Sequence, residues 1–158
     1  MRIYVAMNNG SDINFFETIL ELSKVQKDWV NNLVDKEILN AKNNLRISIL
    51  GLAYKANTNS IKNSPAIDLL RKFRRNIAIV YDPQVKLSEE FIDVVSGTTA
   101  LDTFLNVDMV LIMTPWKEFS DLDFGSISGD INQKLIIIDP FGVLMNTKLP
   151  RNFELKQL

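Results

Sequence analysis

The chain has 158 residues, a formal net charge of -1 and 46% hydrophobic residues, as expected for a globular protein with one well-formed core. The near-neutral charge argues against a nucleic-acid or anionic-membrane surface, and the lack of a long apolar run or signal-peptide pattern indicates a cytoplasmic protein without a membrane span. Because the chain contains no Cys and no His, a thiol nucleophile, a Ser-His pair, an imidazole acid or base and a zinc site of the usual kind are excluded.

The first predicted element is a long helix over residues 13–43. Its apolar side chains recur mostly at three- and four-residue steps, at Phe16, Ile19, Leu22, Val25, Trp29, Leu33 and Ile38. One amphipathic helix of this length would extend roughly 45 Å, which is longer than a domain of this size usually covers. We therefore expect part of the apolar face to need another partner, and we predict a homodimer through residues 13–43. The alternative is two shorter helices, broken near Asn31-Asn32 and packed on one core.

After residue 44, strand-like and helix-like segments alternate, which is typical of a parallel sheet with helices on its faces. Strands are predicted near 46–50, 77–81, 109–113 and 135–138, with a short final strand within 153–158, and helices near 65–75, 88–95 and 101–105. Residues 120–133 are expected to form a loop with one helical turn. The predicted fold is α/β: a Rossmann-like open parallel sheet with helices on both faces, in residues 45–158, preceded by the helical region 1–44.

The segment from residue 45 to residue 70 joins the first predicted strand to the next helix. Gly51 ends an apolar strand, Lys55 lies in the polar loop that follows, and Ser64-Pro65 has the pattern of an N-cap followed by proline at the first helical position. The free N–H groups of that first turn and the Lys55 ammonium could together face a phosphate. An ordinary strand–loop–helix joint with a solvated lysine is the competing interpretation.

Unusual residues also follow the other strands, and in open α/β sheets ligands bind outside the carboxyl ends of the strands. The candidate site consists of Gly51, Lys55, Thr114, Trp116 and Asp139. Each of these residues has a structural alternative. Asp139 precedes a proline and suits a turn, as does the aspartate of Asp82-Pro83, and Trp116 could simply cover the core.

A dinucleotide-binding fingerprint is only partly present. Gly51, Ala53 and Ala56 give G-x-A-x-x-A, but the helix is expected to start only near Ser64, whereas the fingerprint loop opens its helix directly. Asp82 lies about thirty residues further on, rather than the usual ~20. We therefore do not expect this segment to be the primary NAD site.

The segment GLAYKANTNSIKNSPAIDLL, residues 51–70, resembles the signature G-hydrophobic-A/S-F/Y-K-x-x-T-D-D-x-R-x-S-P of the UDP-glucose/GDP-mannose dehydrogenase family. YDP at 81–83, TPWKEF at 114–119 and IIIDPFGVL at 136–144 resemble further family segments. The long helix, with Glu21-Leu22 and Gln26, resembles the helix that joins the two halves of the family and forms its dimer interface. The resemblance covers nearly the whole chain but only about the C-terminal half of the family's length.

This resemblance implies a role in NAD-dependent oxidation of the C6 alcohol of a nucleotide sugar to a carboxylate. In the family an N-terminal domain holds NAD and supplies a catalytic cysteine, and residues 2–9 resemble the segment directly after the cysteine motif. The chain is therefore expected to be the nucleotide-sugar-binding part, inactive alone, with a separate N-terminal dehydrogenase half as a possible partner. The alternative is a non-catalytic, degenerate remnant that acts as a nucleotide-binding or dimerisation module.

Individual residues can be carried over from the same signature. Tyr54 and Lys55 match the aromatic residue and the lysine that contact the substrate nucleotide, and Lys62 takes the position of an arginine that reaches the NAD side. Lysine keeps the charge of that arginine but not its bidentate fork. The signature's two acidic residues are replaced by Asn59-Ser60, and the run from Asp139 lacks the arginine of a common D-G-R motif. The resemblance leaves open which sugar is bound and whether the base is uridine or guanosine.

Overall fold

The structure, a computed structural model, describes residues 13–41, 44–128 and 134–158. A long helix, α2, is followed by five strands, three short α-helices and two 3-10 helices. In chain order they are α2 Ile13–Asn40, β1 Ile47–Leu50, α3 Pro65–Lys72, β2 Ile77–Tyr81, η1 Glu89–Phe91, η2 Ala100–Phe104, β3 Met109–Ile112, α4 Lys117–Ser120, α5 Phe124–Ser128, β4 Leu135–Asp139 and β5 Phe153–Gln157.

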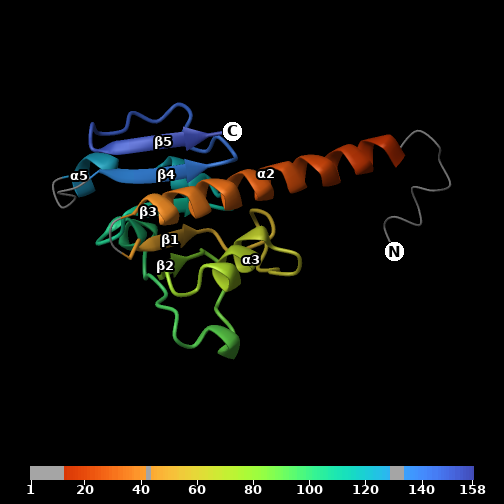
Figure 1. The fold of residues 1–158 in the computed structure, drawn as a ribbon, viewed down its shortest axis with the longest axis horizontal. Coiled ribbons are helices and arrows are strands. Elements are labelled where there is room, and N and C mark those ends of the chain that lie inside the picture. Colours follow the sequence, from red (N-terminus) through yellow and green to blue (C-terminus); the bar gives the residue numbers. More distant parts are fainter. Residues whose placement is uncertain (1–12, 42–43, 129–133) are drawn as a thin grey trace.

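The five strands form one parallel sheet in the order β2-β1-β3-β4-β5 (Figure 1). Its layout is that of a doubly wound α/β sheet, in which β1 and β3 are neighbours at the point where the strand order reverses. Helices α2 and α3 cover one face, while η2, α4 and α5 contribute to the core on the other face. The predicted Rossmann-like sheet with helices on both faces, preceded by a long helix, is confirmed.

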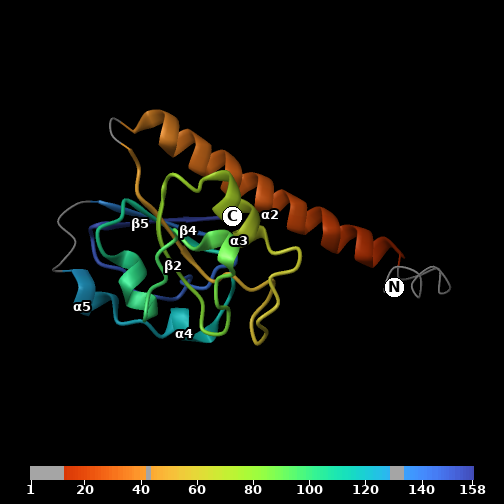
Figure 2. The ribbon, with the colours of Figure 1, turned by 90° about the horizontal axis from the view of Figure 1, so that it is seen from below.

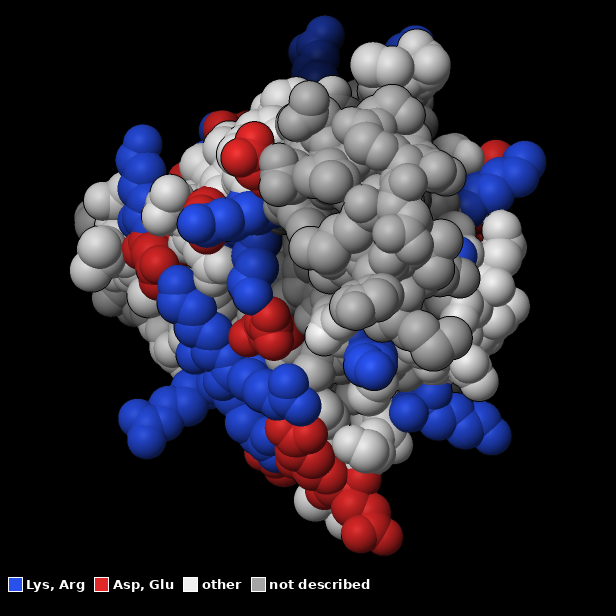
Figure 3. All heavy atoms as spheres, turned by 90° about the vertical axis from the view of Figure 1, so that its right-hand side faces the viewer, with Lys and Arg blue, Asp and Glu red and all other residues white. Residues whose placement is uncertain are grey.

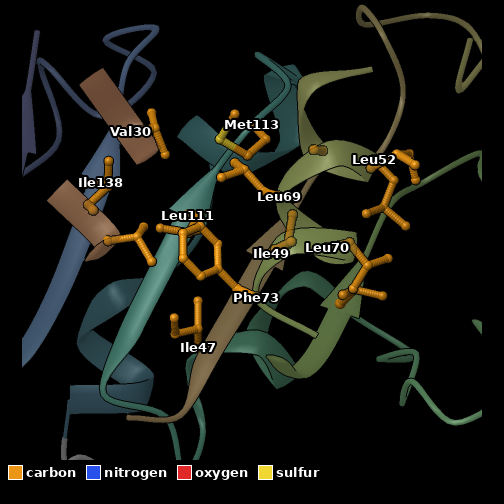
Figure 4. Packing of buried hydrophobic residues seen from close by; sticks show 14 of the residues in the cluster. Val30, Ile47, Ile49, Leu52, Leu69, Leu70, Phe73, Leu111, Met113 and Ile138 are labelled. Atoms are coloured by element: carbon orange, nitrogen blue, oxygen red, sulfur yellow. The ribbon is translucent and has the colours of Figure 1, made fainter. Parts of the chain in front are cut away.

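Alternation along the strands divides the core into two layers. In β1, Ile47 and Ile49 pack toward α2 and α3, whereas Leu50 belongs to the opposite layer; all three are fully buried. This period of two follows from the pleat of the strand and explains why β1, β2, β3 and β4, which have core on both faces, are apolar at nearly every position. Figure 4 shows the first layer, in which Leu69 and Phe73 from the α3 region meet Leu111 of β3.

Helix α2 is continuous over 28 residues, so the alternative of two shorter helices is wrong. Val30 and Val34 are fully buried against the sheet, and Trp29, Leu33 and Ile38 pack around them. The N-terminal half of α2 projects beyond the sheet in both ribbon views (Figures 1 and 2). Of the predicted apolar positions there, Val25 is 53% exposed, whereas the side chains of Phe16, Ile19 and Leu22 lie outside the described residues.

Ion pairs fasten α2 to the domain on two sides. Lys27 and Asp35 pair with Asp68 and Lys72 of α3, and Glu37 pairs with Lys156 of β5. Of these three pairs, Lys156–Glu37 is the least exposed to solvent, with side chains 23% and 19% exposed. The docked half of α2 is therefore held by apolar burial in the middle and by charge at both flanks.

Two helix predictions are corrected by the structure. The helix predicted over 88–95 is reduced to the single 3-10 turn of η1, because the chain straightens and Val95 and Gly97 hydrogen-bond to Val80 at the edge of β2. The helix predicted near 101–105 is the 3-10 helix η2, fixed by a capping box between Thr99 and Asp102. Helix α4 was not predicted, while α5 is the helical turn expected within 120–133. Within the described part of the chain, no helix is long and apolar enough to cross a bilayer.

Candidate functional site

A cavity of about 590 Å³ opens at the carboxyl ends of β1, β3 and β4, between α2 and the start of α3. This volume lies in the range of small-molecule sites, and the position beside the β1/β3 switch point is where open α/β sheets bind ligands. The lining comes from five separate segments: Lys24, Gln26 and Lys27 of α2, Tyr54 and Lys55 after β1, Asn63, Pro65 and Asp68 around the start of α3, Met113 after β3, and Pro140 and Phe141 after β4.

Three lysines and one carboxylate give the cavity a positive charge. Lys27 is paired with Asp68, whereas no ion pair or hydrogen bond joins Lys24 or Lys55 to any residue whose side chain the structure describes. Figure 3 views the molecule from the side on which β4 and β5 end, and among the residues coloured there, basic and acidic side chains lie next to one another. The two unpaired ammonium groups therefore stand out as anion-binding candidates.

The rest of the lining is largely apolar and partly aromatic. Tyr54 is 53% exposed and Phe141 is 37% exposed, and both rings border the same cavity as Met113 and the two prolines. Aromatic rings beside ammonium groups suit a ligand that has both a flat apolar part and an anionic part. Gln26 of α2 donates from Nε2 to the Pro140 carbonyl at 3.2 Å, which ties this helix to the β4 side of the cavity.

Directly before Tyr54 and Lys55, every backbone N–H and C=O group of Leu52 and Ala53 is hydrogen-bonded to a side chain. The N–H groups of Leu52 and Ala53 donate to Oδ2 of Asp82 at 2.7 and 3.0 Å. The Leu52 carbonyl accepts from Ser64 Oγ, and the Ala53 carbonyl accepts from Thr114 Oγ1, both at 2.7 Å. We call these three side chains the clamp; they come from the ends of β2 and β3 and from the start of α3, and they fix the direction in which the loop leaves the sheet.

Gly51 permits this close approach. Its φ is +93°, and a Cβ atom at this position would lie 2.6 Å from Cβ of Thr114. Gly51 is buried and does not line the cavity. The structure therefore places the predicted site residue Gly51 behind the loop, where it allows β1 and the end of β3 to meet.

Trp116 and Asp139 also lie behind the cavity wall. Trp116 is 6% exposed, packs in the second core layer and donates from Nε1 to Asp82 Oδ2 at 3.2 Å. Asp139 is fully buried, and its carboxylate accepts the N–H groups of Phe141 and Leu144 at 3.2 and 2.9 Å and the Gln157 amide at 2.9 Å. Asp139 thus shapes the turn that presents Phe141 to the cavity.

Of the predicted site residues, Tyr54 and Lys55 both line the cavity, next to the start of α3. The strand–loop–helix pattern points to Lys55 alone, whereas Tyr54 is expected from the family resemblance. Lys62 is exposed and does not line this cavity. Sequence reasoning missed Lys24, Lys27 and Phe141, as well as the supporting role of Ser64. Ser64 does stand at the N-cap of α3, but its hydroxyl bonds to Leu52 and not to the helix.

The geometry does not fit the adenosine half of NAD. In dinucleotide folds a carboxylate after the second strand bonds the ribose, and free N–H groups of the Gly-rich turn face the pyrophosphate. Here Asp82 occupies that carboxylate position, but its oxygens accept from Leu52, Ala53, Gln84, Val85 and Trp116. The turn N–H groups are used by the same carboxylate. Within the described residues there is also no group of three or more acidic side chains that could hold a metal ion.

Comparison with known proteins gives a consistent result. A family model described as "UDP-glucose/GDP-mannose dehydrogenase family, UDP binding domain" matches residues 48–146. The chain is 29% identical over 153 residues to a UDP-glucose 6-dehydrogenase of Rickettsia conorii, with 91% of the chain and 34% of that enzyme covered. It is 25% identical over 149 residues to a UDP-glucose 6-dehydrogenase of Caenorhabditis elegans, with 85% and 31% covered.

Solved structures share the fold. A UDP-D-ManNAc dehydrogenase of Pyrococcus horikoshii superposes with a TM-score of 0.60 and 25% identity, over 83% of this chain and 30% of that one. The UDP-N-acetyl-mannosamine dehydrogenase Cap5O of Staphylococcus aureus gives a TM-score of 0.64 at 21% identity, over 83% and 30%. The chain spans about a third of the length of the curated relatives that it matches.

Proposed function

The chain belongs to the UDP-glucose/GDP-mannose dehydrogenase family and contains its UDP-binding domain, and from this premise we propose that the cavity between α2 and α3 binds the nucleoside diphosphate part of a nucleotide sugar. The observation that carries the proposal is the meeting of two unpaired lysines with two partly exposed aromatic rings in one cavity. A nucleoside diphosphate offers both matching parts, an anionic diphosphate and a flat base.

Each cavity residue then has a distinct role. Lys55 and Lys24 supply ammonium groups to the diphosphate from opposite walls, the loop after β1 and helix α2. Tyr54 and Phe141 supply flat apolar surface for the base or the sugar. Gly51, Trp116 and Asp139 act from behind the wall, as parts of the scaffold that positions these groups.

In the complete reaction that we propose, the C6 alcohol of the bound sugar is oxidised to a carboxylate with NAD as the oxidant. This chain would hold and orient the nucleotide sugar, while the NAD site and the catalytic cysteine would come from an N-terminal dehydrogenase half. The step from alcohol to carboxylate removes four electrons and takes up one water, so it consumes two NAD, each of which accepts two electrons. Lys62, at the position of the family arginine, would face that half, and its exposure leaves it free to do so. The isolated chain is expected to be inactive.

We also keep the proposal of a homodimer through residues 13–43. The apolar positions of the docked half of α2 are already covered by the chain's own sheet. The case for a partner therefore rests on exposed Val25 and on Phe16, Ile19 and Leu22, whose side chains lie outside the described residues. A monomer by light scattering at micromolar concentration would contradict this proposal.

A second candidate function is a non-catalytic nucleotide-binding or dimerisation module. It is favoured by the departures from the family signature, in which Asn59 and Ser60 replace acidic residues and Lys62 replaces an arginine. Activity on a nucleotide sugar after addition of a separately expressed N-terminal half would eliminate this candidate.

Calorimetric titration of the purified chain with UDP, and then with GDP, tests the proposed site. We expect saturable binding of one of them, and a Lys24→Ala/Lys55→Ala double variant with an unchanged unfolding midpoint should lose it. Binding that persists unchanged in the double variant would place the ligand elsewhere. A folded wild-type chain that binds neither nucleotide would favour the dimerisation module.

A further inference from the structure

The two edges of the sheet differ in how far other segments of the chain hydrogen-bond to them. At the β2 edge, Val80 exchanges hydrogen bonds with Val95 and Gly97, so residues 95–97 cover the edge. At the other edge lies β5, where the Phe153 N–H donates to the Pro150 carbonyl and, among the described residues, no other hydrogen bond involves the outward backbone groups of the strand. The connection from β4 to β5 does not cover this edge in the plane of the sheet, because Leu144 and Leu149 of that connection pack in the second core layer. Exposed edges of this kind readily accept another strand.

The register of β5 shows which backbone groups are free. The Leu135 N–H donates to the Asn152 carbonyl at 2.9 Å, and Leu135 is paired with Phe153. In a parallel ladder the backbone groups of successive residues alternate in direction, so Glu154 and Lys156 face β4, whereas Phe153, Leu155 and Gln157 face outward. The N–H and C=O of Leu155 therefore point to the open edge at the centre of the strand.

The sequence of β5, FELKQ, is complementary to itself in the antiparallel direction. With two copies centred on Leu155, each Leu155 faces its counterpart, and Glu154 of each copy faces Lys156 of the other. Opposite charges directly across two strands stabilise the pairing. Because Glu154 also pairs with Lys134 and Lys156 with Glu37 within each chain, the pairs between copies would add to existing ion pairs and contribute little energy. The centre also coincides with the outward backbone groups of Leu155, as a hydrogen-bonded pair requires.

We propose that the β5 edge is a self-association surface, on which a second copy of this chain adds its own β5 antiparallel about a two-fold axis at Leu155. The result is one continuous sheet of ten strands with both α2 helices on the same face. This proposal is independent of nucleotide binding and of pairing through α2. Of the six backbone bonds that such a pairing offers, two are lost because the Phe153 N–H already donates to Pro150 at 3.1 Å. Four bonds and a short strand bury less than the roughly 1,200 Å² typical of stable complexes, so we expect weak, concentration-dependent association.

Because the chain contains no cysteine, a single introduced thiol reports on the register. In the proposed dimer the two residues at position 155 have Cα atoms about 5.5 Å apart, within reach of a disulfide. The two residues at position 157 lie four residues apart along the paired strands, at about 13 Å. Under mild oxidation of ~100 μM protein, we expect Leu155→Cys to form covalent dimers at least 10-fold faster than the matched control Gln157→Cys. Equal rates, or no dimer from either variant, would overturn the proposal even if light scattering showed a dimer held by α2.

A proline provides a second test that leaves the fold intact. Leu155→Pro removes an N–H that β4 does not use, and edge strands tolerate proline at such positions. Leu155→Thr keeps the N–H and serves as the control. By sedimentation velocity over a range of concentrations, we expect Leu155→Pro to weaken self-association at least 10-fold and Leu155→Thr to stay within about twofold of the wild type. The same association constant for both variants, each with a native circular dichroism spectrum, would refute the edge pairing.

Discussion

Gly51 and Thr114 approach so closely that a Cβ atom on Gly51 would lie 2.6 Å from Cβ of Thr114 and 2.8 Å from its backbone nitrogen. Because Gly51 also has a φ of +93°, Gly51→Ala combines backbone strain with a clash against a fixed strand end. We expect a loss of about 2–4 kcal/mol in the free energy of unfolding, measured by urea denaturation.

Gly142 is the matched control, since its φ is +68° but nothing lies within 4 Å of a Cβ atom there. Gly142→Ala should cost only the strain, about 1 kcal/mol. Equal losses for the two variants would show that the contact with Thr114 is not the cause.

Asp82 is expected to be the most sensitive member of the clamp. Asp82→Ala leaves the N–H groups of Leu52 and Ala53 and the Trp116 indole without their acceptor, and should destabilise the chain by about 2–4 kcal/mol. Asp82→Asn keeps one acceptor oxygen and should cost less. Nucleotide affinity should fall in both variants, because Tyr54 and Lys55 follow the clamped residues directly.

The control for Asp82 is Asp121, an exposed carboxylate paired with Lys117 on the surface. Asp121→Ala should change the free energy of unfolding by no more than about 0.5 kcal/mol. If Asp82→Ala lowered the free energy of unfolding by as little as Asp121→Ala, the hydrogen bonds of Asp82 would not be what holds the loop after β1 in place.

Lys55→Ala should weaken nucleotide binding by about 1–3 kcal/mol, or roughly 5- to 150-fold in Kd, because it removes a charged hydrogen bond to phosphate. Lys62→Ala serves as the control, since Lys62 is a loop lysine seven positions away and outside the cavity. Calorimetry of both variants with the nucleotide bound by the wild type measures the difference. An affinity of Lys55→Ala that matches that of Lys62→Ala would remove Lys55 from the site.

The partly buried phenol of Tyr81 should make the free energy of unfolding fall at alkaline pH. Burial, followed by a hydrogen bond to Glu118, raises the pKa of Tyr81 from 10.0 to about 12. Because the folded state favours the neutral phenol, the stabilisation is complete below pH 10 and is lost as the pH rises toward 12. With an allowance for solvent near the half-buried ring, the loss should be about 1–2 kcal/mol. Urea unfolding of the wild type and of Tyr81→Phe should show a stability difference that is constant below pH 10 and shrinks above it; a constant difference up to pH 12 would contradict the assignment.

The sequence predicted the sheet well because buried parallel strands leave a strong local pattern. β2 was located at its observed bounds and β5 within one residue of its end, and α2 was recognised from its apolar spacing. The helix predicted over 88–95 failed because a pairing with Val80, distant in sequence, competed with the local helical preference. The division at residue 44 stays a prediction, and the burial of Val30 and Val34 under the sheet shows that the two parts share a core.

The candidate site was predicted only in part. Lys55 is predicted because it lies in the loop that directly follows a recognisable strand, whereas Tyr54 is predicted only from the family signature. Trp116 and Asp139 were placed at the correct strand ends, but strand position does not reveal which way a side chain turns, and both turn inward. Lys24 could not be found, because it enters the cavity only through the angle at which α2 crosses the sheet.

Helix α2 both covers the core and forms a wall of the cavity. A tilt of this helix about its buried segment would therefore change the shape of the cavity. The buried segment contains Val30 and Val34, whereas Lys24 lies in the N-terminal half of α2, which projects beyond the sheet. At 1.5 Å per residue, Lys24 lies about 15 Å from Val34, so a tilt of about 10° would move it by about 2.6 Å. That displacement separates a direct contact with an anion from one bridged by water. Any contact that fixes the projecting half of α2 would therefore also affect the affinity of the cavity for its ligand.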